Sequence, residues 1–262
     1  MKLGGLPGVF AVMLAVSVRA EEPFKLPDRS LFEAGRFVYE RNCMICHGER
    51  GDGTGELSAQ VIPRPRSFAQ GLFKYRSTPF GKLPTNADLE RTIRGGLSGT
   101  AMGMFTQFSS EELRAVVEYL KSFSRRWRRE GNYAAPMTMP EAPHWLADDS
   151  ALTRHGAAGK PVFEALCASC HGTAGDGQGP VAAALMDEWG FPAVPADLRR
   201  THLRSGSELG DIYRVLMTGL NGTPMVSFAD ALSPEQKWDV IAYIAMLRRE
   251  FAGGQSPAKA AQ

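Results

Sequence analysis

The sequence has almost no net charge. Among its 262 residues, 30 are Lys or Arg and 28 are Asp or Glu, so the formal net charge is +2. Lys2 and Arg19 lie in the first 20 residues, where no acidic residue occurs, and the remaining chain therefore has 28 residues of each sign. A protein that binds nucleic acid needs a clear basic excess on one face. The charge balance therefore excludes nucleic acid as the expected partner.

Long apolar runs are also missing after residue 20. The run from Val9 to Val18 is shorter than the roughly 20 apolar residues that cross a bilayer. It follows Lys2 and precedes Val18-Arg19-Ala20, where Val18 and Ala20 suit cleavage. These features are typical of a secretory signal peptide. We therefore expect residues 1–20 to be a signal peptide cleaved after Ala20, with no transmembrane span in the exported chain.

Cysteine is scarce, and all of it lies in two short motifs. The four cysteines occur in Cys43-Met44-Ile45-Cys46-His47 and in Cys167-Ala168-Ser169-Cys170-His171. C-x-x-C-H is the attachment motif of c-type haem. The two thiols add across the haem vinyl groups, and the histidine is an axial ligand of the iron.

Other uses of four cysteines are a zinc site, two disulfides or a redox dithiol. Structural zinc sites usually place such pairs about 15–20 residues apart, whereas about 120 residues separate these pairs. Neither disulfides nor a dithiol needs a histidine after each pair. The motif therefore favours haem.

A repeated phrase offers a second iron ligand to each motif. Gly96-Leu97-Ser98-Gly99-Thr100-Ala101-Met102 matches Gly219-Leu220-Asn221-Gly222-Thr223-Pro224-Met225, and each methionine follows its histidine by about 55 residues. Ligation by histidine and methionine raises the reduction potential of haem. We therefore predict that Met102 and Met225 occupy the distal axial positions. Met104, two residues from Met102, is the alternative ligand in the first site.

The two halves of the chain are related by a nearly constant offset. It is 124 residues between Cys43 and Cys167, and 123 between Met102 and Met225. Such an offset indicates a tandem duplication, and we name the copies the first and second units. No alternating apolar pattern is strong enough to predict a sheet, so an all-α fold is expected.

Each unit has three predicted helices, of which the first leads into the C-x-x-C-H motif. The middle helix starts near Thr85, a predicted N-cap, and ends at Gly95-Gly96; its counterpart covers roughly 207–218. The last helix of each unit begins with a capping box, in which Ser is followed three residues later by Glu or Gln. The two boxes are Ser109 with Glu112 and Ser233 with Gln236.

The predicted organisation has five parts. They are a signal peptide (1–20), a first domain (21–127), a proline-rich linker (128–150), a second domain (151–252) and a flexible tail (253–262). The proline spacing in the linker precludes a continuous helix and favours an extended crossover. The preceding run Arg125-Arg126-Trp127-Arg128-Arg129 is either a docking patch for an acidic partner or the solvated end of a helix.

Glycine-rich segments follow each histidine, at Gly48 to Gly55 and Gly172 to Gly179. We predict tight loops there, with glycines at positive φ and with Asp52 and Asp176 as turn-stabilising acids. Prolines at 63–65 and 192–195 are predicted to cross the histidine side of each haem.

In these proline segments a backbone carbonyl is expected to accept the imidazole N–H. Two roles are open for the segment Phe73-Lys74-Tyr75-Arg76. Its side chains either line the haem and contact a propionate, or its aromatic residues pack in the core and its cations face solvent. Three other histidines occupy no repeated position and are not expected to bind haem: His144, His155 and His202.

Together, the C-x-x-C-H motifs, the glycine-rich loops, the methionine phrases and the closing amphipathic helices resemble class I cytochrome c domains. The tandem copy resembles the two-domain dihaem cytochromes c of bacterial periplasms, over roughly residues 31–123 and 155–250. The resemblance implies two small helical bundles, each around a covalently attached haem c. It also implies that the first and last helices of each unit cross, with Gly35 against Tyr119 and Gly159 against Tyr243.

The implied ligand sets follow from the matched positions. They are Cys43, Cys46, His47 and Met102 for one haem, and Cys167, Cys170, His171 and Met225 for the other.

The resemblance also implies a function, which is to carry single electrons in the periplasm without a catalytic residue. The partners would be a donor dehydrogenase or cytochrome complex and an acceptor oxidase or reductase, and the chain could be a permanent subunit of such an enzyme. The alternative is a haem enzyme, either a dihaem peroxidase or a thiosulfate-type oxidoreductase. Such an enzyme needs an open distal site or a labile distal ligand.

Overall fold

The computed structural model describes residues 28–254. The predicted signal peptide lies outside these residues, and so do residues 255–262 of the predicted tail. Between residues 28 and 254, every regular element is an α-helix or a short 3-10 helix, and β-structure is limited to two isolated bridges. The all-α prediction is therefore confirmed. No helix in this range is long and apolar enough to cross a membrane.

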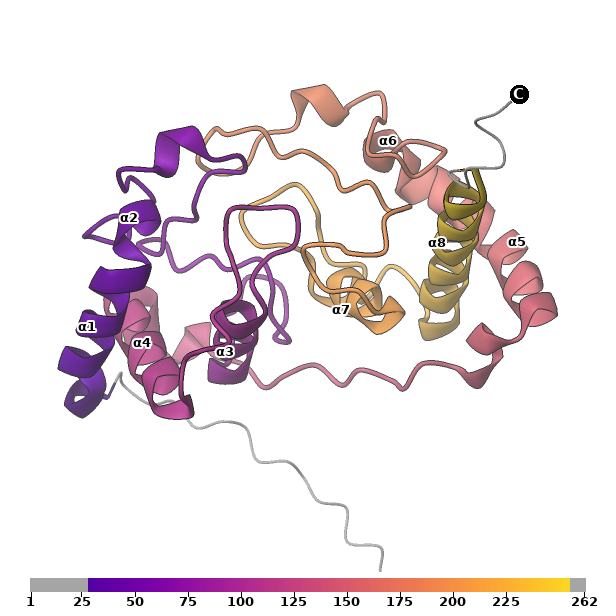
Figure 1. The fold of residues 1–262 in the computed structure, drawn as a ribbon. Coiled ribbons are helices and arrows are strands. Elements are labelled where there is room, and N and C mark those ends of the chain that lie inside the picture. The colour runs from indigo at the N-terminus through magenta and orange to yellow at the C-terminus, as the bar shows by residue number, and fades with distance from the viewer. Residues whose placement is uncertain (1–27, 255–262) are drawn as a thin grey trace, which may run out of the picture.

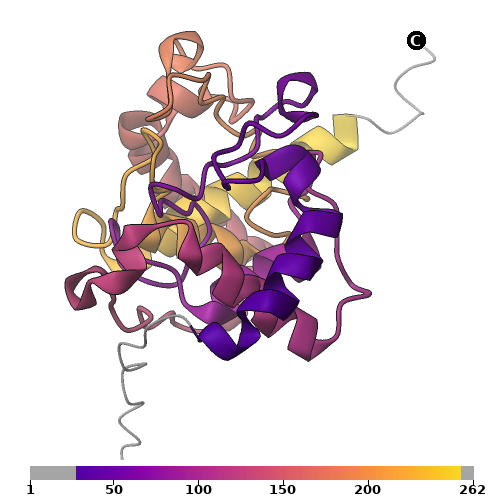
Figure 2. The ribbon, with the colours of Figure 1, turned by 90° about the vertical axis from the view of Figure 1, so that its left-hand side faces the viewer.

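The helices form two lobes, one for each unit (Figure 1). The first lobe contains α1 (Phe32–Asn42), α2 (Met44–His47), α3 (Asn86–Gly95) and α4 (Ser110–Ser122). The second repeats this order with α5 (Asp149–Leu166), α6 (Ala168–His171), α7 (Leu209–Thr218) and α8 (Pro234–Gly254). Short 3-10 helices lie at Arg29–Leu31, Ser58–Gln60, Arg125–Arg128, Glu130–Asn132, His144–Ala147 and Ala182–Ala184. Viewed from the side of the first lobe, the second lobe lies behind it (Figure 2).

The predicted helix starts are confirmed by their caps. Ser109 Oγ accepts from the Glu112 N–H at 3.1 Å, and the Glu112 carboxylate accepts from the Ser109 N–H at 2.8 Å. Ser233 and Gln236 form the same reciprocal pair at 3.1 and 2.9 Å. Thr85 is the N-cap of α3. Each of these bonds satisfies a backbone N–H that the first helical turn would otherwise leave unpaired.

The first and last helices of the first unit cross at Gly35. A Cβ atom there would lie 2.0 Å from the Ala115 carbonyl oxygen and 2.9 Å from the Tyr119 Cβ. Only a residue without a side chain allows this approach, so the predicted contact between Gly35 and Tyr119 is confirmed.

The second unit crosses in the same way. The closest atoms to a Cβ at Gly159 belong to the Asp239 backbone, with the carbonyl oxygen at 1.9 Å. Tyr243 packs against Phe163, with ring centroids 5.2 Å apart, as Tyr119 packs against Tyr39. Tyr243 lies one helical turn beyond Asp239 on α8, just as Tyr119 lies one turn beyond Ala115 on α4, so the two crossings have the same register. The contact between Gly159 and Tyr243 stays a prediction.

The connection between the lobes is extended, as predicted. Residues 134–143 contain no helix, and the Met137 N–H donates to the Ser77 carbonyl at 2.8 Å. Asp149 and Ser150 of the predicted linker belong to α5, and α8 includes Gly253 and Gly254 of the predicted tail.

The basic run before the connection is only partly a solvated surface. Trp127 at its centre is 1% exposed and belongs to the first hydrophobic core. Arg126 donates to the carbonyl oxygens of Gly71 and Gly81. The other three arginines are exposed. The run therefore stabilises the first unit through its inner residues, and only its outer arginines face solvent.

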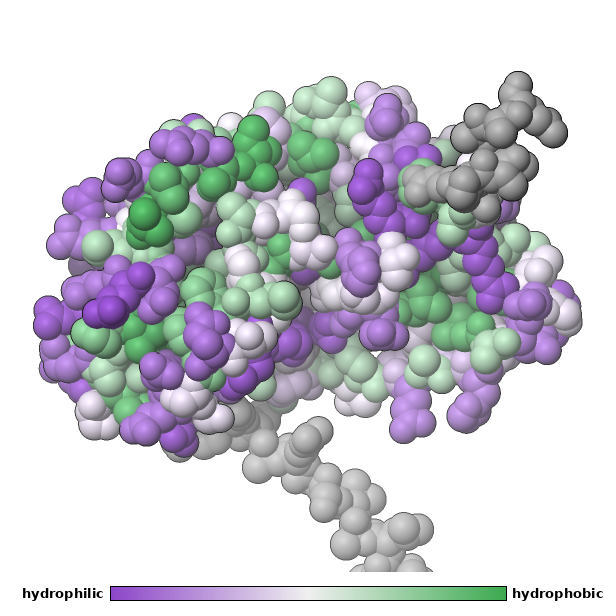
Figure 3. All heavy atoms as spheres, in the orientation of Figure 1, coloured by the Kyte–Doolittle hydropathy of each residue, from purple (hydrophilic) through white to green (hydrophobic). Residues whose placement is uncertain are grey.

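Loops form the contact between the lobes. The segment after α6 reaches the segment after α2 (Figure 1), where Arg64 lies 5.1 Å from the centroid of the Phe191 ring and Arg66 lies 4.0 Å from that of the Trp189 ring. Figure 3 shows apolar residues gathered over the same region of the molecule. The exposed apolar side chains of these two segments include Ile62, which is 88% exposed. The loops that follow the two histidines therefore both join the lobes and present apolar side chains.

Candidate functional site

Each C-x-x-C-H motif forms one helical turn after the long first helix of its unit. The Cys43 N–H donates to the Tyr39 carbonyl, and the His47 N–H donates to the Cys43 carbonyl, both at 2.8 Å. The second unit repeats both bonds at 2.8 Å, from Cys167 to Phe163 and from His171 to Cys167. The motif therefore has one backbone conformation in both units.

The four cysteines lie within the described residues, are half-buried and form no disulfide there. Burial, with a smaller contribution from the neighbouring cysteine, raises the pKa of Cys43 to about 12 and that of Cys167 to about 11. Both thiols are therefore protonated at neutral pH, and a protonated thiol is a poor nucleophile for disulfide exchange. The two pairs also lie in separate lobes (Figure 1), which argues against one zinc site made of all four.

Each motif histidine is oriented by a backbone carbonyl. The Nδ1 atom of His47 lies 3.0 Å from the Arg66 carbonyl oxygen, and that of His171 lies 3.1 Å from the Ala196 carbonyl oxygen. Because a carbonyl oxygen only accepts, Nδ1–H is the donor, and Nε2 keeps the lone pair that binds metal. Burial lowers the pKa of both histidines, although the carbonyl bond opposes this shift, so both rings are neutral at neutral pH.

These carbonyls lie directly after Pro65 and Pro195, in the predicted segments. Gly53 and Gly177 have φ of 79° and 80°, and a Cβ at either position would lie 2.7 Å from the carbonyl oxygen of the respective proline. The glycine loop and the proline segment are therefore in close contact in both units. Asp52 stabilises its loop by accepting from the Thr54 N–H, and Asp176 does so by accepting from the Gln178 N–H.

The two methionine phrases form the same loop. In the first, the Leu97 N–H donates to the Met102 carbonyl at 2.9 Å, and the Met102 N–H donates to Thr100 Oγ1 at 3.0 Å. In the second, the corresponding distances are 2.9 Å from Leu220 to Met225 and 3.3 Å from Met225 to Thr223.

Met102 therefore occupies the position in the first loop that Met225 occupies in the second. Both side chains are half-buried, and Met225 packs against the second core. Met104 lies outside these loop hydrogen bonds, and it is 69% exposed. The loop geometry favours Met102 over Met104.

Two residues of the Phe73–Arg76 phrase are structural. Phe73 is 8% exposed and belongs to the first core, and Arg76 is 1% exposed and donates to backbone carbonyls. His155 lies 2.6 Å from Asp239 Oδ1 and stacks on Trp145, and His202 lies 2.8 Å from Ser207 Oγ. His144 is the first residue of a 3-10 helix.

A group of half-buried cations, Arg66, Lys74 and Arg204, was not predicted as a group. Arg66 Nη1 and Trp189 Nε1 are buried, and neither has a hydrogen-bond partner among the described residues. Burial, followed by the charges of Arg66 and Arg204, lowers the pKa of Lys74 to about 8. Buried cations need anions nearby, and the acidic side chains of Asp187 and Glu188 oppose the lowering of the Arg66 pKa by burial. The sequence contains one signal for this group, because Lys74 follows Pro65 by the same nine positions as Arg204 follows Pro195.

The residues present fit a haem c in each unit. Each unit has two thiols, a neutral imidazole held through Nδ1, and a methionine in a matched loop. Half-buried apolar side chains pack against each hydrophobic core, such as Met44 and Phe105 in the first unit and Phe228 in the second. The half-buried cations Arg66, Lys74 and Arg204 suit the carboxylates of haem propionates.

The Cytochrome c family model matches the chain twice, over residues 32–124 and 156–248. The chain therefore belongs to the cytochrome c family. Its two cytochrome c domains bind covalently attached haem c, and their general function is electron transfer by haem.

Among solved structures, the chain is similar to a chain of the reducing HAO-like protein complex Kustc0457/Kustc0458 of Kuenenia stuttgartiensis. The two are 36% identical, with a TM-score of 0.75, and the similarity covers 86% of this chain and 98% of that one. A comparison with curated proteins gives no match.

Proposed function

We propose that the protein is an exported, periplasmic carrier of single electrons with two haems, each ligated by histidine and methionine. The observation that carries this proposal is the repetition of the complete ligand set. Both units have the same histidine–carbonyl bond and the same methionine loop. A haem iron with two protein ligands has no position for a substrate, so the proposed activity is electron transfer rather than catalysis.

In this proposal, each side chain has a distinct role. Cys43, Cys46, Cys167 and Cys170 attach the haems, which supply a one-electron couple at iron. His47 and His171 bind through Nε2, because Nδ1 donates to Arg66 or Ala196. Met102 and Met225 fill the distal positions, and the soft thioether favours ferrous iron and so raises the potential. Arg66, Lys74 and Arg204 offset propionate charge.

We further propose that the chain exchanges electrons with a protein partner and works as a subunit of an oxidoreductase complex. The similarity to a chain of a reducing HAO-like protein complex supports this reading. The donor would be a dehydrogenase or cytochrome complex, and the acceptor an oxidase or reductase.

The spectrum of the purified ferric protein tests the ligation. We expect two haems per chain, a methionine–iron charge-transfer band with the intensity of two sites, and no spectral change when carbon monoxide is added to the reduced protein. The variant Met225→Ala serves as a positive control, because it should bind carbon monoxide at one haem. A high-spin component or carbon monoxide binding in the unmodified protein would contradict the carrier and favour a haem enzyme.

A further inference from the structure

The two methionine loops differ in their surroundings, although their own hydrogen bonds match. A Cβ at Gly99 in the first loop would meet no atom within 4 Å. At the matching Gly222, it would lie 2.8 Å from the Trp189 ring and 3.1 Å from Arg66 Nη1, which belongs to the first unit. A Cβ at Gly219 would lie 2.8 Å from the ring of Phe80, also in the first unit. The first unit therefore covers the second loop, whereas the first loop is open at this position.

Asn221 connects the covered loop to the first unit by two hydrogen bonds. Its Oδ1 accepts from the Gly81 N–H at 2.9 Å, and its Nδ2 donates to the Lys82 carbonyl at 3.2 Å. The side chain spans the two units and is buried, with the residue 1% exposed. The matching residue of the first loop is Ser98, which is exposed. The duplicated phrase therefore differs at the position that contacts the other unit.

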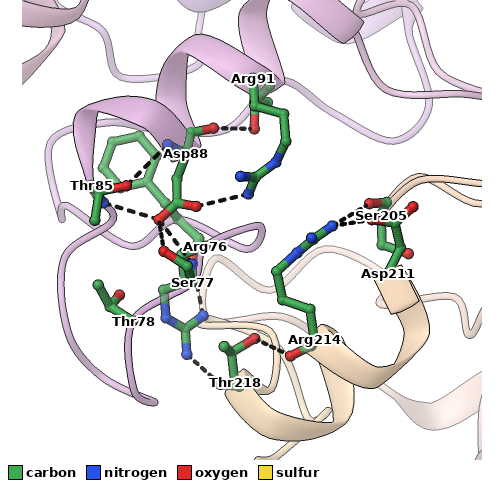
Figure 4. A network of polar contacts seen from close by, with 12 residues as sticks. Arg76, Ser77, Thr78, Thr85, Asp88, Arg91, Ser205, Asp211, Arg214 and Thr218 are labelled. Atoms are coloured by element: carbon green, nitrogen blue, oxygen red, sulfur yellow. Dashed lines mark hydrogen bonds and ion pairs between the residues drawn. The ribbon is translucent and has the colours of Figure 1, made fainter. Parts of the chain in front are cut away.

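Arg76 of the first unit contacts the start of the same loop. Its guanidinium donates to the carbonyl oxygens of Thr218 and Gly219, where α7 ends and the loop begins (Figure 4). It also donates to Phe73 and Pro79 carbonyls in its own unit. A cation at a helix C-terminus is favourable because the last carbonyls carry partial negative charge and lack helical partners. Burial lowers the pKa of Arg76 to about 10, so the guanidinium stays charged at neutral pH.

The segment that carries Arg76 is itself anchored to α3. Asp88, which is 1% exposed, accepts from the N–H and the hydroxyl of Ser77 at 2.8 and 2.9 Å. It also accepts from the Thr85 N–H at 3.0 Å (Figure 4). A continuous set of contacts therefore joins the start of α3, through Ser77 and Arg76, to the end of α7 and the loop of Met225.

We propose that Arg76 and Asn221 are positioning residues through which the first unit holds the Met225 loop against the second haem. The distal methionine of the second haem then depends on contact between the units, whereas that of the first haem depends on its own unit. This inference rests on the proposed function, because it takes Met225 as an iron ligand.

The variant Asn221→Ser, made in the full-length protein with both haems, tests this proposal. It gives the second loop the residue type that the first loop has at the matching position. We expect amide exchange in residues 220–225 to accelerate about 5- to 30-fold, the factor for a loss of about 1–2 kcal/mol. We also expect half of the methionine–iron band to disappear at a lower temperature than the other half. The matched control Ser98→Asn should change neither readout. Unchanged exchange and unchanged band melting in Asn221→Ser would overturn the proposal.

Arg76→Met is the second variant, with the same expected changes in exchange and in the band. If this variant does not fold, Asn221→Ser alone decides. The unmodified protein separates this inference from the proposed function. If the methionine–iron band of the unmodified protein has the intensity of one site, the ligation of both haems by methionine is wrong. The proposed function and the positioning role are then both wrong. If the band is full and Asn221→Ser changes neither its melting nor the amide exchange of residues 220–225, only the positioning role is wrong.

Discussion

Gly35 lies directly against the backbone of Ala115, where a Cβ atom would come within 2.0 Å of the carbonyl oxygen. Gly159 has the same relation to Asp239 at 1.9 Å, so both crossings of the first and last helices need a glycine. Gly210, in the helix α7, has no atom within 4 Å of the same test position.

We expect Gly35→Ala and Gly159→Ala each to lower the free energy of unfolding by about 3 kcal/mol, the upper range for overpacking a core. Gly210→Ala is the control and should stabilise by about 0.5–1 kcal/mol, because alanine restricts the unfolded chain more than glycine. Chemical denaturation of the protein with both haems measures all three. A loss below about 1 kcal/mol at either crossing would show that the helices separate easily.

Asp88 is a buried carboxylate whose contribution depends on pH. Burial would raise its pKa, but the N–H groups of Ser77 and Thr85 and the Arg91 guanidinium outweigh burial and lower it below 3.8. A carboxyl group with a lower pKa in the folded state stabilises the fold above its unfolded pKa, and this stabilisation disappears as the pH falls through the folded pKa.

Asp88→Asn should therefore lower the free energy of unfolding by about 2 kcal/mol at neutral pH, the value for hydrogen bonds to a charged group. The difference from the unmodified protein should shrink as the pH falls below 3.8. Glu111→Gln, at an exposed position in α4, is the control and should change stability by less than about 0.5 kcal/mol. A difference that stays constant across this pH range would contradict the role given to the Asp88 charge.

Haem attachment is predicted to be independent in the two units. The double variant Cys43→Ala with Cys46→Ala should carry one haem instead of two, and so should Cys167→Ala with Cys170→Ala. Mass spectrometry of the intact chain counts the attached haems. Two covalent haems on either variant would mean that attachment uses other residues.

The first distal ligand is predicted to be Met102, because it shares the loop geometry of Met225. Met102→Leu should remove half of the methionine–iron band, and Met104→Leu should leave the band unchanged, since Met104 is 69% exposed. The two variants control for each other. The opposite pattern would assign the iron to Met104.

Features with partners close in sequence were predictable. The capping boxes at Ser109 and Ser233 close over three residues, and the turns at Asp52 and Asp176 over two, so the sequence contains both partners of each bond. The duplication also showed that Met102 and Met225 occupy matching positions, which the sequence of one unit alone would not indicate.

Features with distant partners were not predictable. Arg76 binds carbonyls more than 140 positions away, and backbone carbonyls leave no signal in the sequence. Trp127 is buried although arginines surround it in the sequence, because its ring packs beside Phe73 and Tyr133. The docking of the two units, which brings Arg66 to Trp189, likewise depends on the folded loops and not on a local pattern.

Proton NMR of the ferrous protein tests the ligation of both haems directly, because a methionine bound to haem iron places its methyl group in the ring current of the porphyrin. We expect two strongly upfield-shifted methyl signals of equal intensity, one from Met102 and one from Met225. One such signal, or none, would contradict the ligation of both haems by histidine and methionine.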